Sequence, residues 1–291
     1  MTMEILGTGL SGLVGSRVVE LLSPQFQFVN VSRETGFDIT DSQMMEHVIR
    51  DSHAPWVFHF AAFTDVQAAE QERTKGQEST SWKVNVEATE NLADLCAKFN
   101  KRLLYISTDY VFDGTKDSYT EDDTPAPRSW YARTKYEGEK RVEKLGDGAL
   151  IVRISNPYKA KPVGKYDFVH KIIDRLRDRQ SVQAPTDQLF SPTFVDDLAH
   201  ALQILIPKDA SGIYHVGSSV PLSPYEAAYC IARIYELDVQ VIEKTTYKAY
   251  FQSRAHAPKR AVLKHDKIDK LGVHLSSFEE GMKEVKKQET L

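Results

Sequence analysis

Tyr131 and Lys135 stand four residues apart, and their residue types suit proton transfer. Residues at this spacing share one face of a helix, which would place the lysine ammonium beside the tyrosine phenol. A neighbouring positive charge stabilises a phenolate and lowers the pKa of a tyrosine from its usual value of ~10. Such a tyrosine can exchange a proton with a carbonyl or alcohol oxygen near neutral pH. The same spacing also occurs by chance on solvated helix faces, so its meaning depends on the elements around it.

A glycine-rich turn near the N-terminus is the second chemical signal. The apolar run 3–6 precedes it, and an amphipathic helical pattern follows it. Glycines let the backbone approach a pyrophosphate, and the helix N-terminus offers free N–H groups. Two registers fit a dinucleotide motif, Gly7-Gly9-Gly12 and Gly9-Gly12-Gly15. A tight turn without a ligand is the alternative, but a strand before it and a helix after it favour nucleotide binding.

The elements that would position these groups alternate along the chain. The sequence predicts strands at 3–6, 26–31, 56–61, 102–107, 149–154 and 213–216, and helices at 13–22, 41–50, 82–99, 131–144, 168–179, from about 191, and at 223–236. Such alternation indicates an α/β fold, a parallel sheet with helices on both faces. Ligands collect at the carboxyl ends of such strands, where Ala61-Ala62, Ser107-Thr108 and Ser155-Asn156 would converge. A loop is expected at 159–167, and the charged tail 282–291 is expected to fray.

Composition excludes several classes of partner. The net charge of −4 gives no reason to expect nucleic acid or an anionic membrane. We find no apolar run near the ~20 residues of a membrane span and no signal-peptide pattern. Cys96 and Cys230 are too few for a disulfide framework, which favours a cytoplasmic location. The nine histidines show no metal-ligand spacing, so no metal is expected.

The glycine turn, the string Ser107-Thr-Asp-Tyr-Val-Phe-Asp-Gly114 and the Tyr131/Lys135 pair occur in this order in one chain. Together they resemble the extended short-chain dehydrogenase/reductase family, and within it the dTDP-4-dehydrorhamnose reductases and related nucleotide-sugar reductases. The resemblance implies a Rossmann-type doubly wound parallel sheet with a small C-terminal α+β substrate lobe. It divides the chain into a dinucleotide-binding domain, residues 1–155 with about 185–217, and a substrate lobe, residues 156–184 and 218–291.

The resemblance also implies catalytic roles. Tyr131 would donate a proton to a ketone oxygen, and Lys135 would lower the tyrosine pKa and bind the nicotinamide ribose. Thr108 would hold the substrate oxygen through its hydroxyl, which can donate and accept. The hydride must come from a cofactor, because no side chain can carry one. Asn85 matches a position that supports the active-site hydrogen bonds, with a capping or turn-bonding asparagine as the alternative.

Cofactor choice depends on the end of the second strand. The resemblance settles the register as Gly9-Gly12-Gly15, and it places Ser32 and Arg33 where the 2′-phosphate of NADP would bind. Glu34 could instead reach the ribose of NAD after a shift of one residue. We therefore expect NADPH, with NADH as the alternative. The implied cofactor-binding residues are Gly9, Leu10, Ser11, Gly12, Leu13, Val14, Gly15, Ser32, Arg33, Asp38, Ile39, Phe60, Ala61, Ala62, Tyr131 and Lys135. The segment Asp38–Asp41 could equally supply a helix N-cap at Thr40 or Asp41.

The expected reaction is reduction of a nucleotide-linked 4-keto-6-deoxysugar, as in dTDP-rhamnose and polysaccharide synthesis. Dehydration is disfavoured because Tyr110, not a glutamate, follows Asp109. Two alternatives stay open, a nucleotide-sugar epimerase and a non-catalytic dinucleotide-binding regulatory subunit. The implied substrate-binding residues are Thr108, Asp109, Tyr110, Val111, Asn156, Gln188 and Arg254. Asn156 replaces a common family tryptophan, and Ala257-Pro258 replaces an Arg-Pro pair, so the sugar itself is left open. The sequence itself does not indicate an oligomeric state, but the resemblance implies a homodimer through helices 82–99 and 131–144.

Overall fold

The large sheet is parallel and doubly wound, as predicted. The computed structural model describes residues 2–162, 164 and 166–290. Six parallel strands follow the order β2-β1-β3-β4-β5-β8. Their bounds are Met3–Thr8 (β1), Phe26–Val31 (β2), Trp56–His59 (β3), Arg102–Thr108 (β4), Ala149–Ile154 (β5) and Gly212–Val216 (β8). The central strands β3, β4 and β5 are buried on both faces, typical of a sheet that helices cover on both sides.

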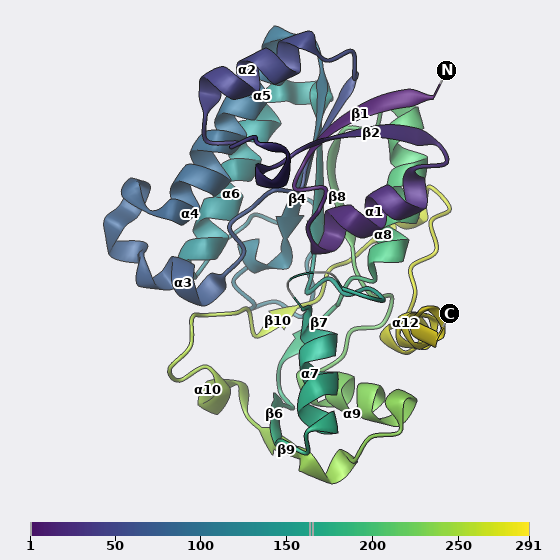
Figure 1. Ribbon diagram of the computed structural model, residues 1–291. Helices are drawn as coiled ribbons and strands as arrows, with labels where there is room; N and C mark the ends of the chain where they lie inside the picture. The colour runs from purple at the N-terminus through teal and green to yellow at the C-terminus, as the bar shows by residue number, and fades with distance from the viewer. Residues whose placement is uncertain (1, 163, 165, 291) are drawn as a thin grey trace.

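Helices pack on each face of this sheet (Figure 1). On one face lie α1 (Leu13–Leu22) and α8 (Val195–Leu205), which share a buried core with β1 and β5. On the other face lie α2 (Ser42–Asp51), α5 (Ala88–Lys98) and α6 (Trp130–Val142), which share a second core. The reversal of strand order between β1 and β3 leaves a crevice at the carboxyl ends of the strands.

The helix predicted at residues 82–99 is interrupted. It begins as α4 (Thr80–Trp82), continues as a π-helical turn over Lys83–Glu87, and becomes α5 only at Ala88. The sequence prediction also missed α3 (Val66–Gln71). Single π-turns cost backbone hydrogen bonds and are therefore tolerated mainly where they position a side chain.

A smaller lobe lies below the sheet in Figure 1. It contains α7 (Phe168–Arg177), α9 (Pro224–Tyr235), α10 (Tyr247–Tyr250) and the strand pairs β6 with β9 (Val182–Pro185, Ile242–Thr245) and β7 with β10 (Leu189–Phe190, Arg260–Ala261). Its core is formed by α7, α9 and α12 (Phe278–Thr290). From α11 (Asp266–Asp269) onward the chain is back at the large domain, where Ile268, Val273 and Leu275 enter the core of the sheet.

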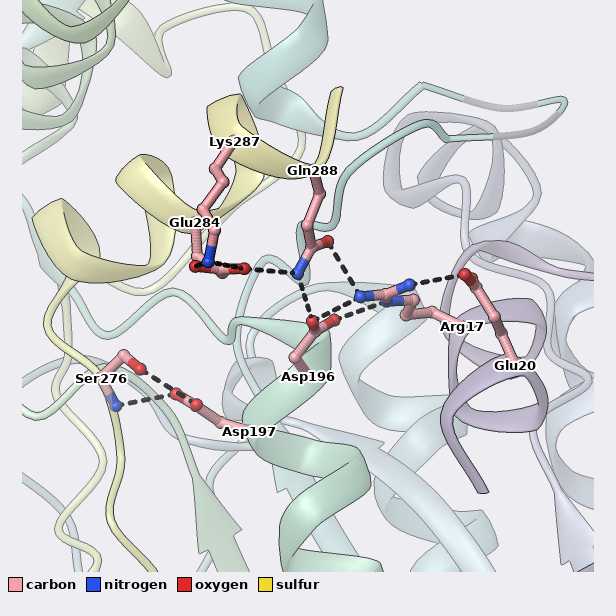
Figure 2. A network of polar contacts seen from close by, with 8 residues as sticks. All are labelled: Arg17, Glu20, Asp196, Asp197, Ser276, Glu284, Lys287 and Gln288. Carbon is pink, nitrogen blue, oxygen red and sulfur yellow. Dashed lines mark hydrogen bonds and ion pairs between the residues drawn. The ribbon is translucent and has the colours of Figure 1, made fainter. Parts of the chain in front are cut away.

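The predicted fraying of the C-terminal tail is wrong. Residues Phe278–Thr290 form helix α12, whose Met282 and Val285 are fully buried. Polar contacts fix its far end, as Figure 2 shows: Gln288 bonds both Arg17 of α1 and Asp196 of α8. The prediction weighed the charge of the tail and missed its buried stripe. Leu291 lies outside the described residues, as do Val163 and Lys165 of the predicted loop.

Arg17 is the centre of that polar network (Figure 2). Its guanidinium donates to both carboxylate oxygens of Asp196, at 2.7 and 2.6 Å, and is ion-paired to Glu20. The neighbouring Asp197 accepts from the backbone and hydroxyl of Ser276.

Within the part of the chain that the structure describes, no helix combines the length and apolarity needed to cross a membrane.

Candidate active site

The glycine turn joins β1 to α1 with its backbone exposed to a crevice. Gly9 has φ +66°, and a Cβ there would lie 2.5 Å from the backbone nitrogen of Ala61. Gly12 precedes the first turn of α1 and provides no side-chain cap, so the first N–H groups of the helix are free for a ligand. Gly7 lies inside β1. The turn therefore fits a pyrophosphate held by backbone N–H groups.

A pocket of about 800 Å³ opens in front of this turn. Most of the predicted cofactor residues line it, namely Gly9, Ser11, Gly12, Leu13, Val14, Gly15, Ser32, Arg33, Ile39, Phe60, Ala61, Ala62, Tyr131 and Lys135. Two do not. Leu10 is buried, and its side chain occupies the space beside Gly7. Asp38 accepts two bonds from Thr40 instead. The alternative prediction for residues 38–41 is a helix N-cap. Asp41 provides it, because its carboxylate accepts from the N–H of Met44 at the start of α2.

The end of β2 presents a cation to the pocket. The Arg33 side chain is 78% exposed, and its one ion pair, to Asp38, is long at 3.4 Å. Ser32 lies beside it, held by a capping box with Thr35. Glu34 also lines the pocket, so the acid that could favour NAD is present as well. A weakly paired guanidinium next to a hydroxyl matches the needs of a 2′-phosphate.

Thr108, Tyr131 and Lys135 line the same pocket. Thr108 ends β4, while Tyr131 and Lys135 lie on one face of α6, whose first turn is capped by Ser129. Burial raises the pKa of the Tyr131 phenol, and hydrogen bonding to the Thr108 side chain opposes this only in part. The ring of Tyr110 packs edge-on against Tyr131 at 5.9 Å. The phenol is therefore in its protonated form at neutral pH.

The prediction that Lys135 lowers the pKa of Tyr131 is not met in this arrangement. The Lys135 ammonium donates to the carbonyl of Ile106 at 2.8 Å and lies 3.9 Å from the ring centroid of Tyr105. Burial lowers the pKa of Lys135 to about 7, and the charge of Glu139 opposes that shift. Spacing on the helix brings the two side chains near each other, but strand β4 determines where the ammonium points.

A buried carboxyl group, that of Asp109, lies behind Thr108. Asp109 accepts from the Ser155 hydroxyl at 2.7 Å and from the Thr108 hydroxyl at 3.1 Å. Burial raises the pKa of Asp109 to about 7 against these bonds. Asn156, with φ +38°, donates to Ser155 and lines the pocket. Hydrogen bonds through Ser155 and Asp109 thus connect Asn156 to Thr108. Asn156 replaces the family tryptophan, and Thr108 would hold the substrate oxygen.

The other predicted substrate residues lie at different depths. Tyr110 lines the pocket, whereas Val111 is fully buried. The amide of Gln188 donates to the carbonyl of Pro258 and so fixes the lobe. Arg254 lies 4.3 Å above the ring of Tyr250 in the segment after α10. Gln188 and Arg254 are not among the residues that line the pocket, and their contacts with substrate stay predictions.

Asn85 connects the two halves of the site. Its carboxamide accepts from the N–H of Phe63, at 2.8 Å, and donates to the hydroxyl of Thr134 in α6. Asn85 lies in the π-helical turn, a distortion that often occurs at functional sites. It therefore supports the loop after β3 and the helix of Tyr131, and does not cap a helix.

Sequence reasoning missed several residues that line the pocket. Tyr166, Phe168 and Lys171 come from the start of the lobe, where no motif marks them. These residues of the lobe carry no local signal in the sequence. Ser107, by contrast, is expected at this strand end and does line the pocket, and its buried hydroxyl has no hydrogen-bond partner among the described residues.

Comparisons with known proteins agree with this geometry. The family model described as "RmlD substrate binding domain" matches residues 3–291. A dTDP-4-keto-6-deoxy-D-glucose reductase of Streptomyces niveus is 33% identical over 82% of this chain and 81% of its own. Methionine adenosyltransferase 2 subunit beta of Mus musculus is 30% identical over 97% of this chain and 86% of its own.

A solved structure extends the likeness to three dimensions. The dTDP-4-dehydrorhamnose reductase of Bacillus anthracis, in complex with NADP, superposes with a TM-score of 0.90 at 28% identity. The match covers 99% of this chain and 100% of the Bacillus chain. Sheet, lobe and C-terminal helix therefore all have counterparts in one enzyme.

Proposed function

This chain belongs to the RmlD substrate binding domain family of extended short-chain dehydrogenases/reductases, and we propose that it reduces the keto group of a nucleotide-linked sugar with NADPH. The observation that carries the proposal is the shared pocket. Thr108, Tyr131 and Lys135 line the same pocket as the glycine turn. A dinucleotide and a proton donor therefore meet at the carboxyl ends of the parallel strands.

The side chains have separate roles in the proposed reaction. Tyr131 gives its phenolic proton to the carbonyl oxygen as that oxygen gains negative charge. The buried phenol is protonated at neutral pH, as a proton donor must be. Thr108 orients the same oxygen, and Lys135, when protonated, adds a positive charge to the wall of the pocket. The hydride has to come from the nicotinamide, because no side chain can carry one.

The proposal also covers the identity of the sugar, the cellular location and the oligomeric state. We propose a 4-keto-6-deoxysugar as the substrate, in deoxysugar or surface-polysaccharide synthesis. A nucleotide-sugar substrate and two unpaired cysteines, Cys96 and Cys230, support a cytoplasmic enzyme. We also propose a homodimer through α5 and α6, and light scattering on the purified chain tests that oligomeric state.

A second candidate function rests on the mammalian relatives, which are named as subunits of methionine adenosyltransferase. A chain of this kind could bind the dinucleotide and act through a partner enzyme. The presence of Thr108, Tyr131 and Lys135 speaks against a purely binding role, which requires no proton donor. Epimerisation, a third candidate, would regenerate the cofactor and consume none.

The deciding experiment follows the loss of NADPH absorbance with a panel of nucleotide 4-keto-6-deoxysugars. The Tyr131→Phe variant should lose activity by about 10²–10⁴-fold, because a positioned general acid is removed. Tyr136→Phe is the matched control on the same helix, since Tyr136 does not line the pocket. NADPH binding without consumption would reject the reductase. Isomerisation of the sugar would then identify an epimerase, and its absence would favour the subunit.

A further inference from the structure

The Lys135 ammonium has an aromatic partner that the catalytic motif does not contain. Its Nζ lies 3.9 Å from the ring centroid of Tyr105, close enough for a strong cation–π attraction. The carbonyl of the next residue, Ile106, accepts a bond from the same Nζ at 2.8 Å. Both partners belong to β4, whereas Lys135 belongs to α6. Tyr105 is completely buried and Lys135 is only 3% exposed, so solvent does not weaken the contact.

The Tyr105 ring is held in place from several sides. Its hydroxyl lies against α6, at 3.4 Å from the carbonyl of Lys135. A Cβ added at Gly138 would lie 2.5 Å from that hydroxyl, so the helix approaches the ring only because residue 138 is glycine. The ring of His59 packs beside it at 5.6 Å. Tyr105 is therefore a fixed surface onto which the lysine side chain is placed.

The charged and titratable groups around Lys135 show why the Tyr105 ring matters for its ammonium. On its own helix, Glu139 is the nearby acid, but both of its oxygens are bonded to Arg153 of β5. Tyr131 is protonated because its phenol is buried. His59 of β3 is neutral, since burial lowers its pKa to about 3. The negative face of the Tyr105 ring thus attracts the ammonium where the one neighbouring acid on α6 is already shared with an arginine.

We propose that Tyr105 is a positioning residue of the active site, whose ring face seats the Lys135 ammonium at the wall of the cofactor pocket. The seat favours the charged form of the buried lysine, because attraction to the ring offsets part of the cost of removing the ammonium from water. The carbonyl of Ile106 then fixes its direction. The consequence for catalysis rests on the proposed reductase function, but the seat itself does not.

A direct test measures the titration of Lys135 without any turnover. The protein is labelled at the lysine ε-carbons, and the Lys135 signal is assigned by its loss in Lys135→Met. Tyr105→Phe keeps the ring face and should titrate like the wild type. Tyr105→Leu removes the face and should titrate about one pH unit lower. Equal titration of the leucine variant and the wild type, both folded by circular dichroism, would overturn the proposal.

A graded series covers the case in which Tyr105→Leu does not fold. Phenylalanines with increasing fluorine substitution are introduced at position 105 by nonsense suppression. Fluorine withdraws charge from the ring face with little change in ring size, so the pKa of Lys135 should fall stepwise along the series. A pKa that stays constant across the folded members of the series would show that the ring acts by packing alone.

Two functional measurements extend the test to the pocket. The pH dependence of NADPH affinity, measured by calorimetry, should shift with the Lys135 titration in Tyr105→Leu and not in Tyr105→Phe. The pH profile of kcat should move in the same direction, whereas a packing defect would lower activity equally at every pH. If the chain consumes no NADPH, the reductase proposal fails, while the titration and affinity measurements still decide whether Tyr105 seats the lysine.

Discussion

Glu139 of α6 and Arg153 of β5 form a bidentate ion pair in the interior of the sheet domain. Both carboxylate oxygens accept from the guanidinium, at 2.8 and 2.7 Å, and neither side chain is more than 1% exposed. The guanidinium also lies 5.1 Å from the ring of Phe112. The pair joins the helix of Tyr131 and Lys135 to β5, the strand that Ser155 follows.

Breaking this pair should strongly destabilise the fold. Glu139→Gln leaves the Arg153 charge buried without its partner, and we expect a loss of about 3–5 kcal/mol in the free energy of unfolding. Replacing both, in Glu139→Leu/Arg153→Met, should cost much less because no charge is left buried. Urea denaturation measures both. Glu46→Gln, which removes an exposed pair with Lys98, is the control and should change nothing measurable.

Arg33 should determine the preference for NADPH. Removing a charge-assisted contact in Arg33→Ala should lower kcat/KM for NADPH by about 10- to 100-fold and leave the value for NADH nearly unchanged. Arg50→Ala is the control, because Arg50 is exposed on α2 and pairs with Asp51 away from the pocket. An equal fall with both cofactors would mean that Arg33 supports the turn after β2 instead of a phosphate.

Gly138 should be intolerant of any side chain. A Cβ there would lie 2.5 Å from the Tyr105 hydroxyl and 2.6 Å from the carbonyl of Asn85. Gly138→Ala should therefore destabilise the protein by about 1–3 kcal/mol through overpacking. At Gly148 a Cβ meets nothing nearer than 3.4 Å, so Gly148→Ala should stay within about 0.5 kcal/mol of wild type. Similar melting temperatures for the two variants would contradict this.

His170 should make stability depend on pH above neutrality. Burial lowers its pKa, but bonds to Asp167 and Glu289, each 2.7 Å long, outweigh burial and raise the pKa to about 9. A raised pKa in the folded state stabilises the protein fully below the unfolded value of ~6.5 and loses this effect as pH rises through about 9. The stability advantage of wild type over His170→Gln should shrink between pH 6.5 and 9. An advantage that is constant over this range would refute the prediction.

The sequence predicts the parts of this fold whose signals are local. Alternating apolar runs identify the six strands of the sheet, and the glycine turn and the Tyr131/Lys135 pair identify the pocket. The π-helical turn at Asn85 escapes prediction because no local pattern marks it, and the partners of Asn85 there, Phe63 and Thr134, are distant in sequence. Residues of the lobe, such as Tyr166 and Lys171, reach the pocket only through the tertiary fold.

The direction of a side chain is a second limit. Helical spacing places Lys135 near Tyr131, yet the ammonium points to Tyr105 and Ile106, because these groups are on the strand beneath the helix. The C-terminal residues show that composition alone is also an insufficient guide. Their charged composition suggested fraying, whereas Met282 and Val285, three residues apart, form the buried stripe of α12.

The link between Arg17 and Gln288 also bears on when the protein can fold during its synthesis. The two residues are separated by 271 positions, and Asp196, their common partner, is made between them. Helix α1 precedes α8 and α12 in the chain, so Arg17 obtains Asp196 and Gln288 as partners only after those helices have been synthesised. The part of the apolar face of α1 that shares a core with α8 is therefore left uncovered until α8 has emerged.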